Sequence, residues 1–245
     1  MSNWYSKEAK DNDIVVSTRI RLARNIENLP FPSFMTTNDK KNLGEQIKKA
    51  ILESDTPFAK TLKYISMEDV PENEIYAMVE RHIISPEFAK NPEGRAIIIS
   101  EDESICVMIC EEDHIRIQVI LPGLNLEEAY DTANKIDDLL SSKLNFAFDN
   151  KLGYLTECPT NIGTGLRASL MLHLPLMESN GSIGNIAETI GKIGFTVRGM
   201  YGEGSKSKAS LYQISNQITL GITEKNAIDN LNVIATQLIN KEKEE

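Results

Sequence analysis

The chain is poor in cysteine, histidine and tryptophan. Its 245 residues include three Cys, three His and one Trp, and aromatic residues make up 6% of them. An odd and sparse set of cysteines, without an apolar signal segment at the start, excludes a disulfide framework and is typical of a reducing compartment. We therefore expect a cytoplasmic protein in which Cys106 and Cys110 belong to the core.

Long apolar runs and an excess of basic residues are also missing. No apolar stretch approaches the roughly 20 residues that a membrane-spanning helix needs. Acidic residues outnumber basic ones by 36 to 26, which gives a formal net charge of −10. This balance argues against nucleic acid as a partner, because nucleic-acid binders present a basic surface. It is compatible with a cationic substrate.

Two common nucleotide-binding motifs are absent. No Gly-x-Gly-x-x-Gly sequence follows an expected strand, and where Gly199 and Gly204 have the Walker A separation, Ser205 stands in place of the lysine. These two ways of cradling a phosphate are excluded. If the protein uses ATP, other residues must hold the phosphates.

The hydrophobic patterns predict a mixed order of strands and helices. Period-two or β-branched runs predict strands over 13–18, 62–67, 95–100, 104–110, 115–121, 166–174, 195–201 and 211–220. Helical spacing predicts helices over 38–52, 71–82, 126–148 (the longest), 183–193 and 223–239, the last with Thr223 as N-cap. Consecutive strands without helices between them favour an α+β fold with an antiparallel sheet flanked by helices. We expect one domain over 13–240, a loose tail over 1–12 and a charged, solvated tail over 241–245.

Five arginines occur in similar settings, beside glycine or small hydroxyl residues on or near the expected strands. They are Arg19, Arg21, Arg116, Arg167 and Arg198. Because side chains alternate along a strand, Arg19 and Arg21 share one face. Guanidinium groups bind phosphate oxygens through forked hydrogen bonds, so the set favours a polyphosphate clamp. For any one of them alone, an ordinary surface ion pair explains the residue equally well.

Two glutamates and one cysteine could act on a substrate. Glu112 lies four residues before Arg116, Glu203 lies in a glycine-rich loop, and Cys158 lies in a Pro/Gly turn near Arg167. Carboxylates at such places could orient an amine or guanidinium and take its proton, and a cation could activate the thiol. From the residues alone, a solvated turn at 111–113, a loop charge at Glu203 and a structural thiol at Cys158 remain open. The three histidines form neither a metal-binding spacing nor a catalytic triad.

The motifs together resemble the ATP:guanidino phosphotransferases. The matching segments are 16–21, 111–116, 158–164 with 167–169, and 197–199 with Gly202 and Glu203, in the family's order over residues 13 to about 220. Segments 80–86, 201–205 and 214–221 are similar to the bacterial protein-arginine kinases of the McsB group rather than to creatine or arginine kinases. The resemblance implies an antiparallel sheet flanked by helices, as in phosphagen kinases, and transfer of phosphate from ATP to a guanidino group.

The resemblance also implies roles for single residues. Glu112 would be the catalytic base, Glu203 would hold the guanidinium, and Cys158 would lie beside it. The implied nucleotide-binding residues are Ser17, Thr18, Arg19, Ile20, Arg21, His82, Arg116, Arg167, Ala168, Ser169, Leu170, Met171, Arg198, Gly199, Met200, Tyr201 and Gly202. ATP would bring Mg2+ with it, and no metal site of the protein's own is expected. Gly163 and Gly165 would let their loop approach the nucleotide closely.

The sequence departs from the family pattern in several places, and these departures decide which functions we consider. About a dozen residues precede the first motif, where small-molecule phosphagen kinases have a helical domain, and Met171 stands where they usually carry histidine. Both differences favour phosphorylation of arginine in proteins, with an activator of the McsA type and the Clp protease system as implied partners. The phosphoarginine-reading C-terminal domain of the McsB group, with its Arg-Asp-x-x-Arg-Ala motif, is not among these 245 residues. The alternatives are a kinase of free arginine or another small guanidino compound, and a non-catalytic regulator.

Overall fold

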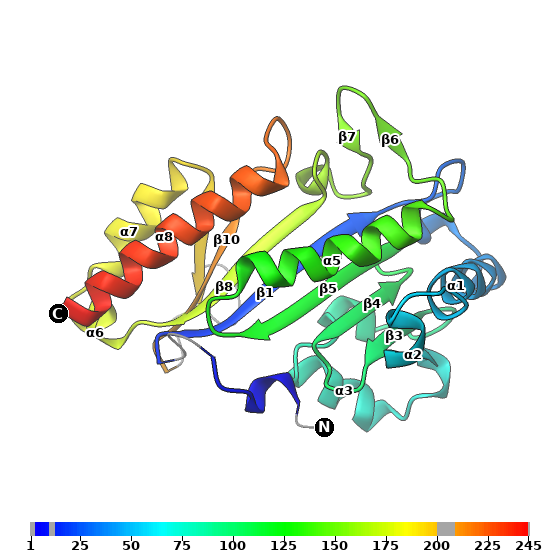
Figure 1. Cartoon of the computed structure of the whole chain (residues 1–245), viewed down its shortest axis with the longest axis horizontal. Helices are drawn as coiled ribbons and strands as arrows, with labels where there is room; N and C mark the ends of the chain where they lie inside the picture. The colour runs from blue at the N-terminus through cyan, green and yellow to red at the C-terminus, as the bar shows by residue number, and fades with distance from the viewer. Residues whose placement is uncertain (1–2, 10–12, 200–208, 245) are drawn as a thin grey trace.

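The computed structural model describes residues 3–9, 13–199 and 209–244 of the chain. In this part, eight strands form one antiparallel sheet in the order β2-β3-β4-β5-β1-β8-β10-β9 (Figure 1). Their bounds are β1 Val15–Arg24, β2 Leu62–Ser66, β3 Ala96–Ser100, β4 Ile105–Ile109, β5 Ile115–Pro122, β8 Leu166–His173, β9 Phe195–Gly199 and β10 Leu211–Asn216. A separate hairpin pairs β6, Phe148–Asp149, with β7, Gly153–Tyr154. The α+β fold with an antiparallel sheet is thus confirmed.

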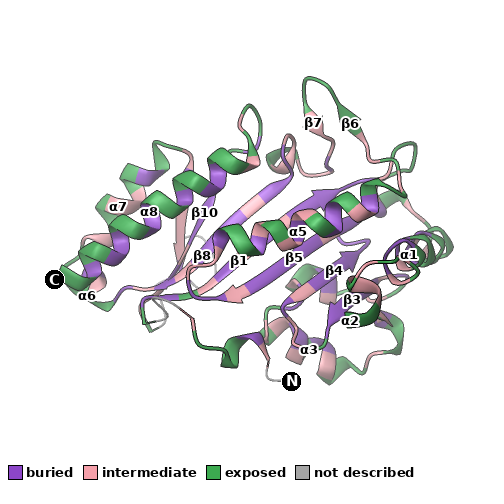
Figure 2. Ribbon diagram, viewed as in Figure 1, coloured by how far each residue is buried: buried purple, intermediate pink, exposed green. Residues whose placement is uncertain are grey.

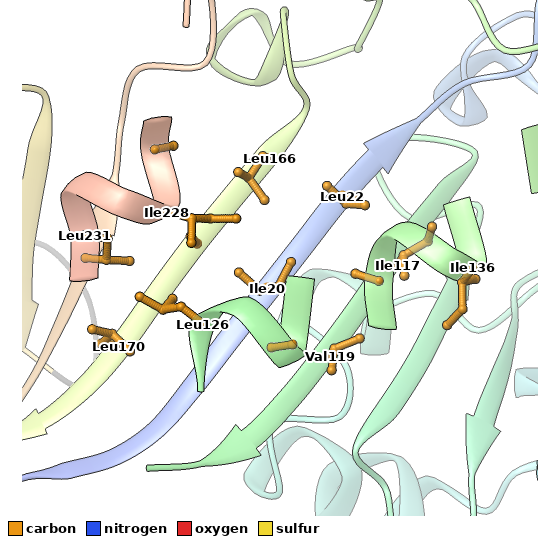
Figure 3. Packing of buried hydrophobic residues seen from close by; sticks show 14 of the residues in the cluster. Ile20, Leu22, Ile117, Val119, Leu126, Ile136, Leu166, Leu170, Ile228 and Leu231 are labelled. Atoms are coloured by element: carbon orange, nitrogen blue, oxygen red, sulfur yellow. The ribbon is translucent and has the colours of Figure 1, made fainter. Parts of the chain in front are cut away.

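One group of helices covers one face of the sheet. They are α1 Thr37–Leu52, α5 Leu126–Ser141, α7 Ile183–Gly191 and α8 Glu224–Glu244. Helix α5 crosses β1 and β5, and α8 crosses β8 and β10 (Figure 1). The strands beneath them are largely buried (Figure 2), and Figure 3 shows strand residues such as Ile20 and Leu170 packed against Leu126 and Leu231 of these helices. Alternation along each strand creates this core, because every second residue is apolar.

The opposite face of the sheet is covered only in part. Short helices α3, Glu72–Glu80, and α4, Pro86–Ala89, pack on β3 and β4 through a second cluster that includes Met78, Phe88 and Met108. The remaining short helices are α2, Phe58–Thr61, and α6, Pro175–Ser179. Over β1, β5 and β8, this second face lines a cavity instead of a core. The partial cover therefore leaves a place for a ligand.

Several expected elements differ at their ends. The first strand continues to Arg24, so Arg19 and Arg21 lie within it rather than after it. The helix expected over 126–148 ends at Ser141, and α8 is longer, with 21 residues. Thr223 caps α8 as expected, because its Oγ1 accepts from Asn226 N at 3.2 Å.

Each segment expected as a loose or solvated tail contains one buried residue among those that the structure describes. Trp4 is 8% exposed, and its backbone N–H donates to the backbone carbonyl of Asp102 at 3.0 Å. At the other end, Glu242 is 5% exposed and accepts hydrogen bonds from Leu176 N at 2.7 Å and Met177 N at 3.1 Å. Composition predicted solvation at both ends. At each end a specific hydrogen bond accompanies the burial, from the Trp4 backbone N–H at one end and to the Glu242 carboxylate at the other.

None of the helices in the described residues combines the length and apolar character needed to cross a membrane.

Candidate functional site

Four strands place arginines on the partly covered face of the sheet. We call this set the arginine face; its members are Arg19, Arg21, Arg116, Arg167 and Arg198. Arg21 lies directly opposite Arg167 across β1 and β8, and opposite Gln118 across β1 and β5. Arg198 lies opposite Gln213 across β10 and β9. The strand register thus gathers arginines that are up to about 180 residues apart in the sequence.

The arginine face has more positive charge than its surroundings neutralise. Burial, followed by the like charges of Arg167 and Arg116, lowers the pKa of Arg19 to about 10. Burial also lowers the pKa of Arg21, and repulsion from Arg19 is the next cause. Arg21 Nε is buried and makes no hydrogen bond with any described residue. A bound polyanion would relieve the repulsion and supply the acceptors.

Arg116 is held by two glutamates. Its Nη1 donates to Glu111 Oε1 at 2.6 Å, and its Nη2 lies 3.5 Å from Glu112 Oε2. Glu111 is buried and also accepts from Ser85 Oγ at 2.6 Å, so its carboxylate is fixed. No pattern in the sequence distinguished Glu111 as the firmer partner of Arg116. Further hydrogen bonds on this face run from Arg19 Nη2 to Gln213 Oε1 at 2.9 Å and from Arg167 Nη2 to Ser215 Oγ at 3.3 Å.

A small cavity of about 140 Å3 brings the charged groups and the thiol together. It is lined by Arg21, Ala23, Glu112, Arg116, Cys158, Thr160, Asn161, Gly165 and Arg167. Burial, partly offset by Arg116, raises the pKa of Glu112, and a hydrogen bond with Cys158 opposes the rise. A carboxylate with a raised pKa beside guanidinium groups can accept a proton from a substrate close to a bound phosphate.

Cys158 differs from the other two cysteines. Its Sγ lies 3.0 Å from Thr160 Oγ1, and the residue is partly exposed. Cys106 and Cys110 are buried, and burial raises the pKa of Cys110 to about 12 and that of Cys106 further. The expectation that these two belong to the core is confirmed, and Cys158 is the cysteine that a substrate can reach.

A larger cavity of about 770 Å3 adjoins the small one and shares Arg21 and Arg116 with it. Its lining includes Ser17, Arg19, His82, Ser169 and Met171 from the expected nucleotide-binding set. Burial lowers the pKa of His82, so its ring favours the neutral form. Residues that sequence reasoning missed, such as Trp4, Gln118 and Gln213, also line it. Aromatic and amide groups of this kind suit the base and sugar of a nucleotide.

Other residues of the expected nucleotide-binding set point away from both cavities. The side chains of Thr18, Ile20, Ala168 and Leu170 are buried on the helix-covered face, as Figure 3 shows for Ile20 and Leu170. Thr18 Oγ1 donates to Gly123 O at 2.7 Å. These four side chains alternate with the arginines and support the sheet. Gly199 ends β9, and Met200, Tyr201, Gly202 and Glu203 lie outside the described residues.

Gly163 and Gly165, the two glycines before Arg167, lie where other parts of the backbone come very close. Gly163 has φ +115°, and a Cβ there would meet Thr219 O at 2.1 Å. Gly165 has φ +63°, and a Cβ there would meet Ala23 O at 2.6 Å. Close backbone approach explains both glycines. The loop is therefore fastened to its neighbours within the protein, and Gly165 also lines the small cavity.

Within the described residues, no three His, Cys, Asp or Glu side chains are grouped so that they could hold a metal ion. Glu111 and Glu112 both interact with Arg116 of the arginine face. The fold and this site define the class of the protein: guanidinium groups arranged around a proton acceptor suit a phosphotransferase.

Comparisons with known proteins identify the family. The family model described as ATP:guanido phosphotransferase, C-terminal catalytic domain, matches residues 42–245. The protein-arginine kinase of Halothermothrix orenii is 48% identical over 245 residues, covering 100% of this chain and 69% of the relative. That of Clostridium acetobutylicum is 46% identical over 242 residues, covering 99% of this chain and 71% of the relative. The chain therefore belongs to the ATP:guanido phosphotransferase family.

Solved structures show the same fold. A duplicated taurocyamine kinase from Schistosoma mansoni, with bound transition-state-analogue components, aligns with a TM-score of 0.85 at 29% identity, covering 100% of this chain and 35% of that chain. A lombricine kinase aligns with a TM-score of 0.81 at 23% identity, covering 96% of this chain and 67% of that chain. The fold is that of a phosphagen kinase catalytic domain, and ATP is the phosphoryl donor that the family uses.

Proposed function

We propose that this chain transfers the γ-phosphoryl group of ATP to arginine side chains of proteins. The observation that carries the proposal is the small cavity in which Glu112 and Cys158 meet Arg21, Arg116 and Arg167. Curated relatives that cover nearly the whole chain are named protein-arginine kinase, which supports a protein acceptor.

The nucleotide occupies the larger cavity, with its phosphates on the arginine face. The base and sugar lie toward His82 and Trp4, and the γ-phosphate lies where the two cavities share Arg21 and Arg116. Mg2+ arrives with ATP and neutralises part of the phosphate charge when bound. The arginines supply the remaining positive charge, and their positions in the strands keep them oriented for transfer.

Glu112 acts as the base. The acceptor guanidinium is protonated at neutral pH because its pKa exceeds about 12. As its nitrogen attacks phosphorus, Glu112 takes the proton, and the bond from phosphorus to the leaving ADP oxygen breaks. Glu203 holds the guanidinium in line, and Cys158 positions or polarises it without forming a covalent intermediate.

The class of the enzyme suggests its acceptor proteins and its partners. Acceptors are cytoplasmic proteins with exposed arginines, whose positive charge suits a chain of net charge −10. An activator of the McsA type and the Clp protease system are the partners that the family likeness suggests.

A kinase of a small guanidino compound is the second candidate. The likeness to taurocyamine kinase favours it, since the fold and the site face are shared. The protein acceptor is preferred because Met171 in the larger cavity departs from the small-molecule pattern and the curated relatives are named for a protein substrate. A non-catalytic regulator is disfavoured because all five arginines are retained.

Incubation with γ-labelled ATP and either casein or free arginine separates these candidates. We expect label on casein that is stable in base and lost in acid, as a phosphoramidate requires. Label transferred only to free arginine would establish the second candidate, and no transfer to either acceptor would support the regulator.

A further inference from the structure

A buried pair of polar residues lies behind the catalytic cavity. Asn25, just after β1, is 2% exposed, and Asp113, next to Glu112, is 0% exposed. Asn25 Nδ2 donates to Asp113 Oδ1 at 2.7 Å. Neither side chain lines a cavity described above, and Asp113 was expected in a solvated turn. Burying a carboxylate is costly, so its presence here requires a specific reason.

The pair joins three segments of the chain. Asn25 Oδ1 accepts from His114 N at 2.9 Å, and Asn25 Nδ2 also donates to Leu155 O at 3.0 Å. Asp113 Oδ1 accepts a second hydrogen bond, from Glu157 N at 2.8 Å. The end of β1, the turn before β5 and the segment at 155–157 are thereby linked through two side chains.

The linked segments carry the catalytic groups. Glu112 immediately precedes Asp113, and Cys158 immediately follows Glu157. The His114 ring fastens the same turn from its other side, because Nδ1 accepts from Ile26 N at 2.9 Å and Nε2 lies 2.8 Å from Pro30 O. Burial lowers the pKa of His114, which agrees with a neutral ring that donates through Nε2.

We propose that Asn25 and Asp113 are positioning residues that set the placement of Glu112 relative to Cys158. This inference rests on the proposed function, because the placement matters only if Glu112 accepts a proton from a guanidinium beside Cys158. The Glu112 side chain is 41% exposed and its contact with Arg116 is long, at 3.5 Å, so the ion pair with Arg116 does not by itself fix the carboxylate. The Glu112 backbone N–H donates to Glu111 Oε2 at 3.0 Å, and Asp113 anchors the turn on the other side of Glu112.

The two oxygens of Asp113 make the proposal testable. Oδ1 accepts both hydrogen bonds, whereas Oδ2 is buried and makes none with the described residues. In Asp113→Asn the amide oxygen can keep both bonds while the amide nitrogen takes the place of Oδ2. Asp113→Ala removes both bonds, and Asn25→Ala removes the three made by the asparagine.

Glu242→Ala is the matched control. Glu242 is a buried carboxylate that accepts two hydrogen bonds, as Asp113 does, but it lies at the end of α8 and lines neither catalytic cavity. The melting temperature of each variant is measured first, and activity is assayed below the lowest of them. A general loss of stability would affect the control and the test variants alike.

The experiment measures kcat and KM with casein and ATP for the full chain and each variant. We expect kcat to fall about 10²-fold in Asp113→Ala and Asn25→Ala, since small misplacements cost that much. We expect kcat in Asp113→Asn and Glu242→Ala to stay within about threefold of wild type, since their hydrogen bonds at the site are kept. The KM for ATP should change by less than about twofold in all of them, because the arginine face is untouched.

A second readout does not depend on activity. Cys158 is the cysteine that iodoacetamide can reach, since Cys106 and Cys110 are buried. Release of the segment at 155–157 should raise the alkylation rate of Cys158 by about fivefold in Asp113→Ala and Asn25→Ala, and not in Asp113→Asn or Glu242→Ala. If the wild-type protein transfers label to neither casein nor free arginine, the proposed function is wrong. The alkylation rates of Cys158 would still test the link between the segments.

Two results would overturn the positioning role. One is an equal loss of kcat in Asp113→Ala and Glu242→Ala, which would indicate general destabilisation. The other is a loss in Asp113→Asn as large as in Asp113→Ala, which would show that hydrogen bonding by Asp113 is not the cause. An alkylation rate of Cys158 that is the same in every variant would also count against the proposal.

Discussion

Arg21 lies at the centre of the arginine face, opposite Arg167 and between the two cavities. Its pKa is lowered by burial and by the charges of Arg19 and Arg116, and its Nε has no hydrogen-bond partner in the described part of the chain. Such a residue reduces the stability of the free protein. Its presence is explained by what it would do for a bound polyphosphate.

At the same scale, Glu112 is the residue whose loss should affect chemistry alone. We expect Glu112→Gln to lower kcat by about 10²- to 10⁴-fold, because an amide cannot take the proton. ATP affinity, measured by calorimetry, should remain within about twofold of wild type, because the phosphates contact the arginines. A variant with wild-type kcat would remove Glu112 from its role as base.

The pH dependence of the reaction follows from the same carboxylate. Burial is the largest cause of the raised pKa of Glu112, and Asp113 and Glu111 raise it further against Arg116. The base must be ionised, so kcat/KM should fall as pH decreases through the raised pKa. Besides the small cavity, Glu112 lines a third cavity of about 220 Å3. Apart from Arg116 and Glu111, the charged groups around these two are Lys40, Arg95, Glu157, Arg21 and Arg167.

Removal of the Asp113 charge tests that assignment. In Asp113→Asn the pKa of Glu112 should be lower, because a neighbouring negative charge is lost. The acid limb of the kcat/KM profile should therefore move to lower pH. An acid limb that stays in place, or moves to higher pH, would show that another group controls it.

At the scale of elements, β1 contributes to both faces of the sheet. Arg19 and Arg21 face the cavities, whereas Ile20 and Leu22 belong to the core under α5. A shift of the register by one residue would exchange the two sets. Arg24 at the end of β1 opposes such a shift, because it donates to Asp137 Oδ2 of α5 at 2.8 Å.

Loss of Arg24 should therefore destabilise the fold. Arg24 and Asp137 are both nearly buried, and the guanidinium also stacks on the Tyr154 ring at 3.5 Å. Arg24→Ala leaves the Asp137 carboxylate buried without its partner, and we expect about 3–5 kcal/mol lower stability in urea unfolding. The exposed pair of Lys48 and Glu45 serves as the comparison, since Lys48→Ala should cost less than about 1 kcal/mol.

A second variant separates charge from packing. In Arg24→Met combined with Asp137→Leu, no unpaired charge remains, so a large part of the lost stability should return. If the double variant is as unstable as Arg24→Ala, the contacts of the guanidinium with Tyr154 and the backbone account for the effect instead.

At the scale of the whole molecule, the two faces of the sheet have different roles, one in stability and one in the candidate site. The face under α1, α5, α7 and α8 (Figure 1) holds the main core. The other face holds the two cavities and a small core under α3 and α4. The chain is acidic overall, with a net charge of −10, yet five arginines gather on one face. The arrangement concentrates positive charge where an anionic nucleotide would bind.

This arrangement predicts that ATP stabilises the protein. At about 100 times its Kd, ATP should raise the melting temperature by about 5 to 10 °C. Arg21→Gln removes one like charge, so the free variant should melt at a higher temperature than wild type. Its shift with ATP should be smaller. A lower melting temperature for the free variant would show that Arg21 stabilises the unliganded sheet.

Sequence patterns predicted most of the sheet and part of the site. The strands over 95–100 and 104–110 form the expected hairpin, because apolar runs flank a short polar turn. Alternation correctly placed Arg19 with Arg21 on the face that lines the larger cavity. The helix expected over 126–148 stopped at Ser141, because local periodicity cannot show where a chain leaves its helix for a hairpin.

The residues that sequence reasoning missed depend on distant partners. Asn25 and Asp113 are 88 residues apart, and their hydrogen bond exists only because β1 and β5 are neighbours in the sheet. Trp4 and Glu242 belong to segments of ordinary polar composition, and their burial depends on Asp102 and on the start of α6. Periodicity carries no information about such pairs.

The sequence by itself determined the class of fold, the motifs of the family and the alternation that sets arginines against apolar residues. These properties are local, because they depend on residue type and on spacing of a few positions. Only the tertiary structure decided that Thr18, Ile20, Ala168 and Leu170 support the core while their neighbours face the cavities. It also decided that Asp113 is buried beside Glu112, since burial and strand register are set by packing between distant segments.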